Sequence, residues 1–214
     1  MSATVASLNF NMFRENTYIL FDETRECIII DPGCYEAHER IELSQFISDN
    51  QLVPVRLLNT HCHIDHVFGN KFVADTWGLQ LEIHRGELPV LAAYPEVGRL
   101  YGISVEHESP SPGCFIEEGD IIRFGNTQLE AILTPGHSPA SLSFFCREDQ
   151  FLIAGDVLFR ESIGRTDLPG GDYDTLIASI KDKLFLLGND VKVYPGHGAP
   201  TTIGYERLFN PFIN

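Results

Sequence analysis

The chain has 214 residues, of which 43% are hydrophobic and 21% charged, as expected of a globular protein with a buried core. Its formal charge of −15 argues against nucleic acid and anionic membranes as partners, because both are polyanions. Its longest apolar runs are strand-sized, well short of the roughly 20 residues that cross a bilayer. Composition therefore argues against nucleic-acid-binding and membrane-spanning classes of protein.

The cysteines predict a cytoplasmic protein with free thiols. They are odd in number and include no CxxC pair, which is typical of a reducing compartment. The first residues, MSATVASLNF, lack the basic and apolar regions of a secretory signal. The five cysteines are Cys27, Cys34, Cys62, Cys114 and Cys146.

The first half of the chain alternates predicted strands and helices. Apolar runs predict strands at 5–11, 17–21, 27–31, 53–58 and 79–83. Helical spacing predicts helices at 37–50, 67–77 and 86–101, the last broken by Pro89 and Pro95.

The second half is richer in strands. Prolines and a glycine predict a loop at 104–118. Strands are predicted at 120–124, 127–133, 141–147, 150–155 and 191–194, and a helix at 172–187. Strands followed by helices, together with hairpin-like pairs, indicate a mixed α/β chain.

One short stretch, THCHIDH at 60–66, concentrates side chains that bind metals. In an extended segment His61 and His63 point the same way, so both can hold one ion. Asp65 and His66 then require a turn, which would direct them to a second position nearby. His38, His84 and His107 lie outside this pattern, and we interpret them as structural.

Three further candidate ligands follow predicted strands in the same way. His137, Asp156 and His197 come just after LEAIL, QFLIAG and VKVYPG, and loops at strand ends commonly carry chemistry. One ion needs three or four protein ligands, so seven candidates suit two divalent ions that share one carboxylate. Zinc is the expected metal, and iron and manganese suit the same ligand types.

With these residues identified, the chain resembles the metallo-β-lactamase-fold hydrolases, and most of all short glyoxalase II proteins. THCHIDH, AGDVLF (154–159), IGRTDLPGGD (163–172) and YPGHG (194–198) carry the resemblance. It implies a four-layer αββα sandwich formed by one domain over 1–214. Full-length glyoxalase II has a C-terminal helical domain that contributes to glutathione binding, and we expect this chain to lack it.

The resemblance also implies a role for each ligand. His61, His63 and His137 would bind the first metal, Asp65, His66 and His197 the second, and Asp156 would bridge the two. The implied activity is thioesterase cleavage of S-(2-hydroxyacyl)glutathione or a similar small thioester by a metal-bound hydroxide. The carboxylates of Asp65 and Asp156 are candidates for orienting the attacking water. Asp31 is a candidate partner of a ligand imidazole, and Arg165 a candidate anchor for an anionic substrate.

Other functions remain open at this point. A mononuclear iron persulfide dioxygenase would share the fold, a similar NTHCHxDH stretch and the GRTD turn, but would bind one iron through two histidines and an aspartate. A lactamase is a further possibility. The full ligand set argues against a non-catalytic member of the superfamily, and the net charge argues against a nucleic-acid-processing one. The oligomeric state is not indicated.

Overall fold

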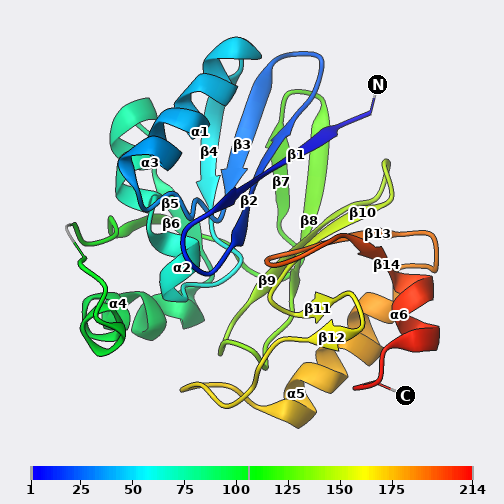
Figure 1. Cartoon of the computed structure of the whole chain (residues 1–214). Helices are drawn as coiled ribbons and strands as arrows, with labels where there is room; N and C mark the ends of the chain where they lie inside the picture. The colour runs from blue at the N-terminus through cyan, green and yellow to red at the C-terminus, as the bar shows by residue number, and fades with distance from the viewer. Residues whose placement is uncertain (1, 106, 214) are drawn as a thin grey trace.

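The computed structural model describes residues 2–105 and 107–213, and its strands form two six-stranded sheets that face each other (Figure 1). The first sheet runs in chain order through β1 (Thr4–Phe10), β2 (Glu15–Phe21), β3 (Glu26–Ile30), β4 (Val53–Leu58), β5 (Leu81–Ile83) and β6 (Pro112–Phe115). The second has the order β14 (Thr201–Thr202), β13 (Lys192–Pro195), β10 (Phe151–Gly155), β9 (Leu142–Cys146), β8 (Thr127–Leu133) and β7 (Ile121–Phe124). A small ribbon pairs β11 (Leu158–Phe159) with β12 (Ser162–Ile163).

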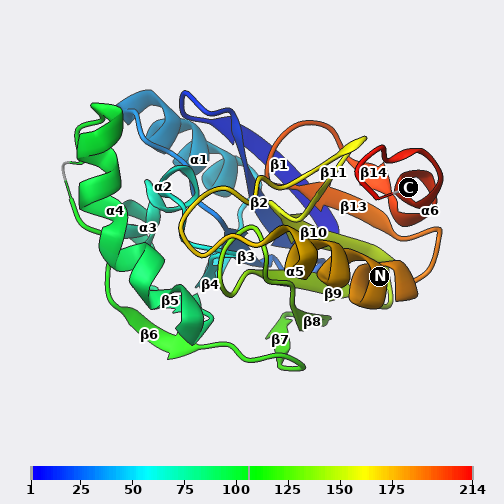
Figure 2. The ribbon, with the colours of Figure 1, turned by 90° about the horizontal axis from the view of Figure 1, so that it is seen from below.

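The helices lie on the two outer faces of this pair of sheets (Figures 1 and 2). Those on the first sheet are α1 (Ala37–Asp49), α2 (Ile64–Val67), α3 (Asn70–Trp77) and α4 (Leu88–Tyr101). Those on the second are α5 (Tyr173–Ala178), which continues as a π turn at Ser179–Lys183 and a 3-10 turn at Leu184–Leu186, and α6 (Ile203–Phe209). None of these helices has the length and apolarity that crossing a membrane requires.

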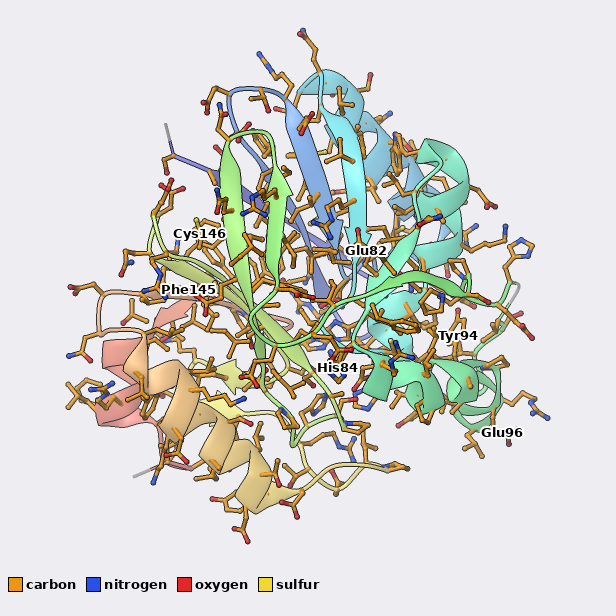
Figure 3. The ribbon with its side chains drawn as sticks, turned by 180° about the vertical axis from the view of Figure 1, so that it is seen from behind. Glu82, His84, Tyr94, Glu96, Phe145 and Cys146 are labelled. Carbon is orange, nitrogen blue, oxygen red and sulfur yellow. The ribbon has the colours of Figure 1, made fainter. Side chains whose placement is uncertain are left out.

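Buried strands with apolar residues on both faces explain the four layers. In β3, Cys27 and Ile29 pack under the helices, whereas Ile28 and Ile30 pack between the two sheets. In β9, Phe145 faces the second helical layer and Cys146 faces the space between the sheets (Figure 3). Successive side chains of a strand alternate between faces, so these strands need cover on both sides. The predicted αββα sandwich is confirmed.

Two predictions about prolines were wrong. Residues 88–101 form one continuous helix, because Pro89 lies in its first turn, where no N–H bond is lost, and Pro95 is accommodated inside it. The predicted loop at 104–118 contains β6, which pairs with β5 at the edge of the first sheet. An edge strand tolerates Pro112 because one side of its backbone has no strand to bond.

The segment after His63 also differs from its prediction. The turn expected at Asp65 and His66 is the single helical turn of α2, whereas the helix predicted at 67–77 is interrupted after α2 and begins as α3 only at Asn70. The predicted helix at 172–187 is helical over most of its length, but it changes from α to π to 3-10 geometry along the chain.

A buried carboxylate, that of Asp22, joins a turn of the first sheet to a turn of the second. It accepts hydrogen bonds from the Thr24 N–H at 3.0 Å, the Asn126 N–H at 2.7 Å and the Thr127 hydroxyl at 2.9 Å. Burial alone would raise the pKa of Asp22, but these hydrogen bonds outweigh it and lower the pKa.

We expect Asp22→Ala to lower the free energy of unfolding by about 2 kcal/mol, because buried N–H and O–H donors lose a charged acceptor. Since the folded pKa is lowered, the contribution of Asp22 is complete above its unfolded pKa of about 3.9 and is lost as the pH falls through the folded value. Urea unfolding at pH 7 measures the effect. Asp49→Ala, at the exposed end of α1, is the control and should change stability by less than about 0.5 kcal/mol. Equal stability of the two variants would contradict the assignment.

Candidate metal centre

Four strands end at the same edge of the sandwich, and each is followed by a candidate ligand. In the second sheet β10 and β13 are parallel, and β8 runs in the same direction because β9 is antiparallel to both β8 and β10. Their carboxyl ends therefore lead into His137, Asp156 and His197 at one edge. The first sheet contributes His61, which follows β4. The candidate site thus spans both sheets.

The structure brings all seven predicted ligands together in two groups that meet at Asp156. Within each group one ligand atom per residue lies within 4.8 Å of the others. The first group is His61, His63 and His137, and the second is Asp65, His66 and His197.

Asp156 lies between the two groups. Its Oδ2 atom is 3.6 Å from Nε2 of His137 and 3.5 Å from Nε2 of His197. Its Oδ1 atom is 3.5 Å from Nε2 of His66. One carboxylate is therefore directed at members of both groups, which is the position of a bridging ligand.

The donor atoms fit divalent cations. His61 Nε2, His66 Nε2 and Asp156 Oδ1 are buried, and none has a hydrogen-bond partner among residues 2–105 and 107–213. Nδ1 of His63 lies 2.9 Å from Nε2 of His137. Buried polar atoms rarely lack partners, and two facing imidazole lone pairs repel each other unless a cation or proton lies between them. Imidazole and carboxylate donors in sets of three or four are typical of metal ions such as Zn²⁺.

Backbone carbonyls fix the orientation of two of the imidazoles. Nδ1 of His137 donates to the carbonyl of Arg165 at 2.8 Å, and Nδ1 of His197 donates to the carbonyl of Phe13 at 3.1 Å. A carbonyl only accepts, so Nδ1 carries the proton and Nε2 presents its lone pair to the centre.

Asp31 orients two more imidazoles, one from each group. Its carboxylate accepts from the Thr60 N–H at 2.7 Å, the Thr60 hydroxyl at 2.6 Å and Nδ1 of His66 at 3.1 Å. Because the Thr60 hydroxyl gives its proton to Asp31, it accepts from Nδ1 of His61 at 3.0 Å. Asp31 has a φ of 51°, a left-handed conformation that Asp tolerates better than most residues. The structure thus places Asp31 behind candidate ligands of both groups.

Burial and charge shift the ligands' pKa values in opposite directions. Burial lowers the pKa of His61 and brings that of His63 to about 3. Burial also opposes protonation of His66, but the Asp65 and Asp156 carboxylates outweigh it and raise its pKa. For Asp156, the nearby imidazoles overcome burial and lower the pKa. The pKa of Asp65 is lowered in the same way, so positive charge beside the two carboxylates, from imidazoles or from metal cations, favours their charged forms.

The loop that carries His197 has no room for a side chain at Gly196. A Cβ there would lie 2.1 Å from Asp156 Oδ1 and 2.8 Å from a ring carbon of His66. Asn16, on β2 of the first sheet, holds this loop by donating to the carbonyls of Pro195 at 3.0 Å and Gly198 at 2.9 Å.

Sequence reasoning missed Glu87, a buried residue that joins the two loops of the first group. It accepts from the Cys62 N–H at 2.9 Å, the Ser138 hydroxyl at 2.7 Å and the Ala140 N–H at 2.8 Å. Cys62 lies between His61 and His63, and Ser138 follows His137. No motif in the sequence marks this glutamate.

The remaining candidates lie outside the ligand groups. Arg165 lines the cavity beside the centre, but its guanidinium pairs with Asp167 at 2.7 and 2.6 Å. His84, which follows β5 (Figure 3), pairs with Glu117 at 3.1 Å and accepts from the Gly86 N–H. These contacts are consistent with the structural interpretation of His84.

Comparison with known proteins identifies the family. The model of the metallo-beta-lactamase superfamily matches residues 12–197. The chain belongs to the metallo-β-lactamase superfamily. Probable metallo-hydrolase YqgX of Bacillus subtilis is 38% identical over 202 residues, covering 93% of this chain and 92% of that protein. Hydroxyacylglutathione hydrolase GloC of Haemophilus influenzae is 35% identical over 207 residues, covering 94% of each.

Solved structures of the superfamily match over nearly the whole chain. The B3 metallo-β-lactamase BLEG-1 is 34% identical, with a TM-score of 0.90, and the match covers 99% of this chain and 100% of that one. TTHA1623, solved in a di-iron-bound form, is 33% identical, with a TM-score of 0.86 and coverage of 97% and 100%. This protein is therefore a metallo-hydrolase of the superfamily, and the comparisons leave its substrate open.

We expect Asp31→Asn to weaken zinc affinity about 10- to 100-fold, the usual effect of losing a partner behind a metal ligand. Asparagine has nearly the same size as aspartate and tolerates the positive φ. Its NH₂ group, however, is a donor and would face the N–H and O–H groups whose hydrogen bonds Asp31 accepts. Competition with a chromophoric chelator measures the affinity. Asp49→Asn on the surface is the matched control, and an Asp31→Asn affinity equal to that control would contradict the role.

Proposed function

We propose that this protein is a binuclear metal-dependent thioesterase that cleaves S-(2-hydroxyacyl)glutathione or a similar small thioester. The observation that carries the proposal is the pair of ligand groups that share Asp156 at the wall of one cavity. The relative named hydroxyacylglutathione hydrolase, which matches 94% of this chain, supports the choice of reaction. Zinc is the proposed metal, and the di-iron form of TTHA1623 makes iron the first alternative.

In this proposal His61, His63 and His137 hold one ion, Asp65, His66 and His197 hold the other, and Asp156 bridges them. When bound, such ions lower the pKa of water toward neutrality and polarise a carbonyl oxygen. The chain's own contribution is rigidity, since hydrogen bonds from Asp31, Thr60 and two backbone carbonyls fix the imidazoles before substrate arrives.

The two aspartates are the groups that can orient the attacking water and accept its proton. Asp65 and Asp156 both line the cavity, so either carboxylate can accept a hydrogen bond from the attacking water and orient it. A thiolate leaving group, with a pKa of about 8.5, needs little protonation, which suits a thioester.

A cysteine nucleophile does not fit the site. Among the described residues that line the cavity, Cys62 is the one cysteine. Its side chain is buried, and burial raises the pKa of its thiol well above the usual value. Such a thiol is a poor nucleophile at neutral pH, which supports water as the attacking group.

Two other reactions are candidates, and each can be assayed on the same metal-loaded protein. A persulfide dioxygenase would need only one iron, and an intact second group of Asp65, His66 and His197 favours the hydrolase. The likeness to a B3 metallo-β-lactamase makes β-lactam hydrolysis the second candidate function.

The test is thiol release from S-D-lactoylglutathione, measured with metal-loaded and chelated protein. We expect turnover only in the loaded protein, restored after chelation by zinc, iron or manganese. His63→Ala should lower kcat/KM at least about 100-fold because it removes a proposed ligand. His38→Ala, on the exposed face of α1, should leave it unchanged.

Equal turnover by chelated and loaded protein would contradict the proposal. So would loaded protein that leaves thioesters intact but hydrolyses a chromogenic β-lactam, or that consumes oxygen with glutathione persulfide.

A further inference from the structure

The cavity beside the metal centre is mostly apolar away from the ligands. Its volume is about 680 Å³, which is within the range of small-molecule sites. Much of its wall comes from two segments, the helix α4 and the loop after Arg165. Six of the apolar side chains matter here: Phe13, Val90, Ala93, Tyr94, Val97 and Leu168.

The helix α4 presents one continuous apolar face to the cavity. Val90, Ala93, Tyr94 and Val97 recur at three- and four-residue intervals, the spacing of neighbours on one side of a helix. Glu96 lies on the outer side of α4, exposed and away from the cavity (Figure 3). This face therefore offers an apolar surface next to the site of hydrolysis.

Two aromatic rings meet at the end of this face. Phe13, from the turn between β1 and β2, contacts Tyr101 edge to face with ring centroids 6.1 Å apart. Both line the cavity, and Phe13 also accepts the hydrogen bond of His197 through its carbonyl. Phe13 thus links the apolar wall at Tyr101 to His197, a proposed ligand.

Away from the metal centre, the cavity offers few cationic side chains to an anionic carrier. Among the described residues that line it, Arg165 is the one Lys or Arg, and Asp167 already pairs with its guanidinium through two hydrogen bonds. Glutathione carries carboxylates at both ends, and a carboxylate that leaves water without a partner is strongly disfavoured. The chain's charge of −15 adds no general attraction for such a carrier.

We propose that the preferred substrates are thioesters with an apolar acyl chain on an uncharged or weakly charged carrier, with the acyl chain lying along α4. This inference rests on the proposed function and narrows its substrate class. It makes S-(2-hydroxyacyl)glutathione a weaker substrate than a neutral thioester of a longer, unbranched acid.

The test compares two carriers across one acyl series. Acetyl, butanoyl and hexanoyl thioesters of N-acetylcysteamine and of glutathione are hydrolysed by the metal-loaded protein. On N-acetylcysteamine, kcat/KM should rise about fourfold for each added methylene, the increment expected for burying a CH₂ group. At equal acyl length the neutral carrier should be at least as good as glutathione. A flat or falling series, or a higher kcat/KM for the glutathione thioester at equal acyl length, would overturn the inference.

A binding measurement separates this inference from the proposed reaction. Thioethers of N-acetylcysteamine with ethyl, butyl and hexyl groups cannot be hydrolysed, and calorimetry gives their Kd. Affinity that rises with chain length supports the apolar cavity even where no thioester is cleaved, an outcome that would reject the thioesterase alone. Affinity that does not rise would overturn the inference even in an active thioesterase.

A pair of neighbouring substitutions locates the acyl chain. Ala93 lines the cavity, whereas Ala92 is exposed on the same helix. Ala93→Phe should lower kcat/KM for hexanoyl-N-acetylcysteamine at least about tenfold and leave the acetyl thioester within about twofold, because the ring fills space that only the longer chain needs. Ala92→Phe should change neither. Equal effects of Ala93→Phe on both thioesters would overturn the placement along α4.

Discussion

The candidate centre depends most on the hydrogen bonds that the buried carboxylate of Asp31 accepts. This carboxylate accepts from His66 directly and reaches His61 through the Thr60 hydroxyl, so one side chain sets imidazoles in both ligand groups. Seven polar side chains crowded together would ordinarily destabilise a fold, because unpaired buried donors and acceptors are costly. Among these seven side chains, the buried atoms without a hydrogen-bond partner in the described residues are His61 Nε2, His66 Nε2 and Asp156 Oδ1, which all belong to the centre. Such atoms are what a preorganised cation site requires.

Much of the fold, and the grouping of the seven candidate ligands, could be predicted from the sequence, because the candidates follow apolar strands and closely spaced histidines are rare by chance. The supporting contacts could not. The carbonyls of Arg165 and Phe13 orient ligands, but every residue has a carbonyl and only the tertiary fold selects these two. Glu87 accepts a hydrogen bond from Ser138, which lies 51 positions later in the chain, and no local pattern records such a contact. The strand β6 escaped prediction because Pro112 suppresses the usual strand signal.

The candidate metal centre and the cavity beside it differ in the chemistry of their side chains. The candidate ligands are polar and mostly buried where the two sheets meet, whereas the adjoining wall on α4 is apolar and supplied by one helical face. Two similar proteins, one named hydroxyacylglutathione hydrolase and the other a B3 metallo-β-lactamase, share the fold with this chain. Differences in substrate among such proteins are therefore expected in the wall rather than in the ligands, since folds carry many functions through variable sites.

The central claim is that seven side chains form one centre for two metal ions. X-ray diffraction from crystals of the zinc-loaded protein, recorded on both sides of the zinc absorption edge, tests it most directly. The account predicts two anomalous peaks on either side of Asp156, one among His61, His63 and His137 and the other among Asp65, His66 and His197. A single peak at full zinc loading, or peaks away from these residues, would contradict it.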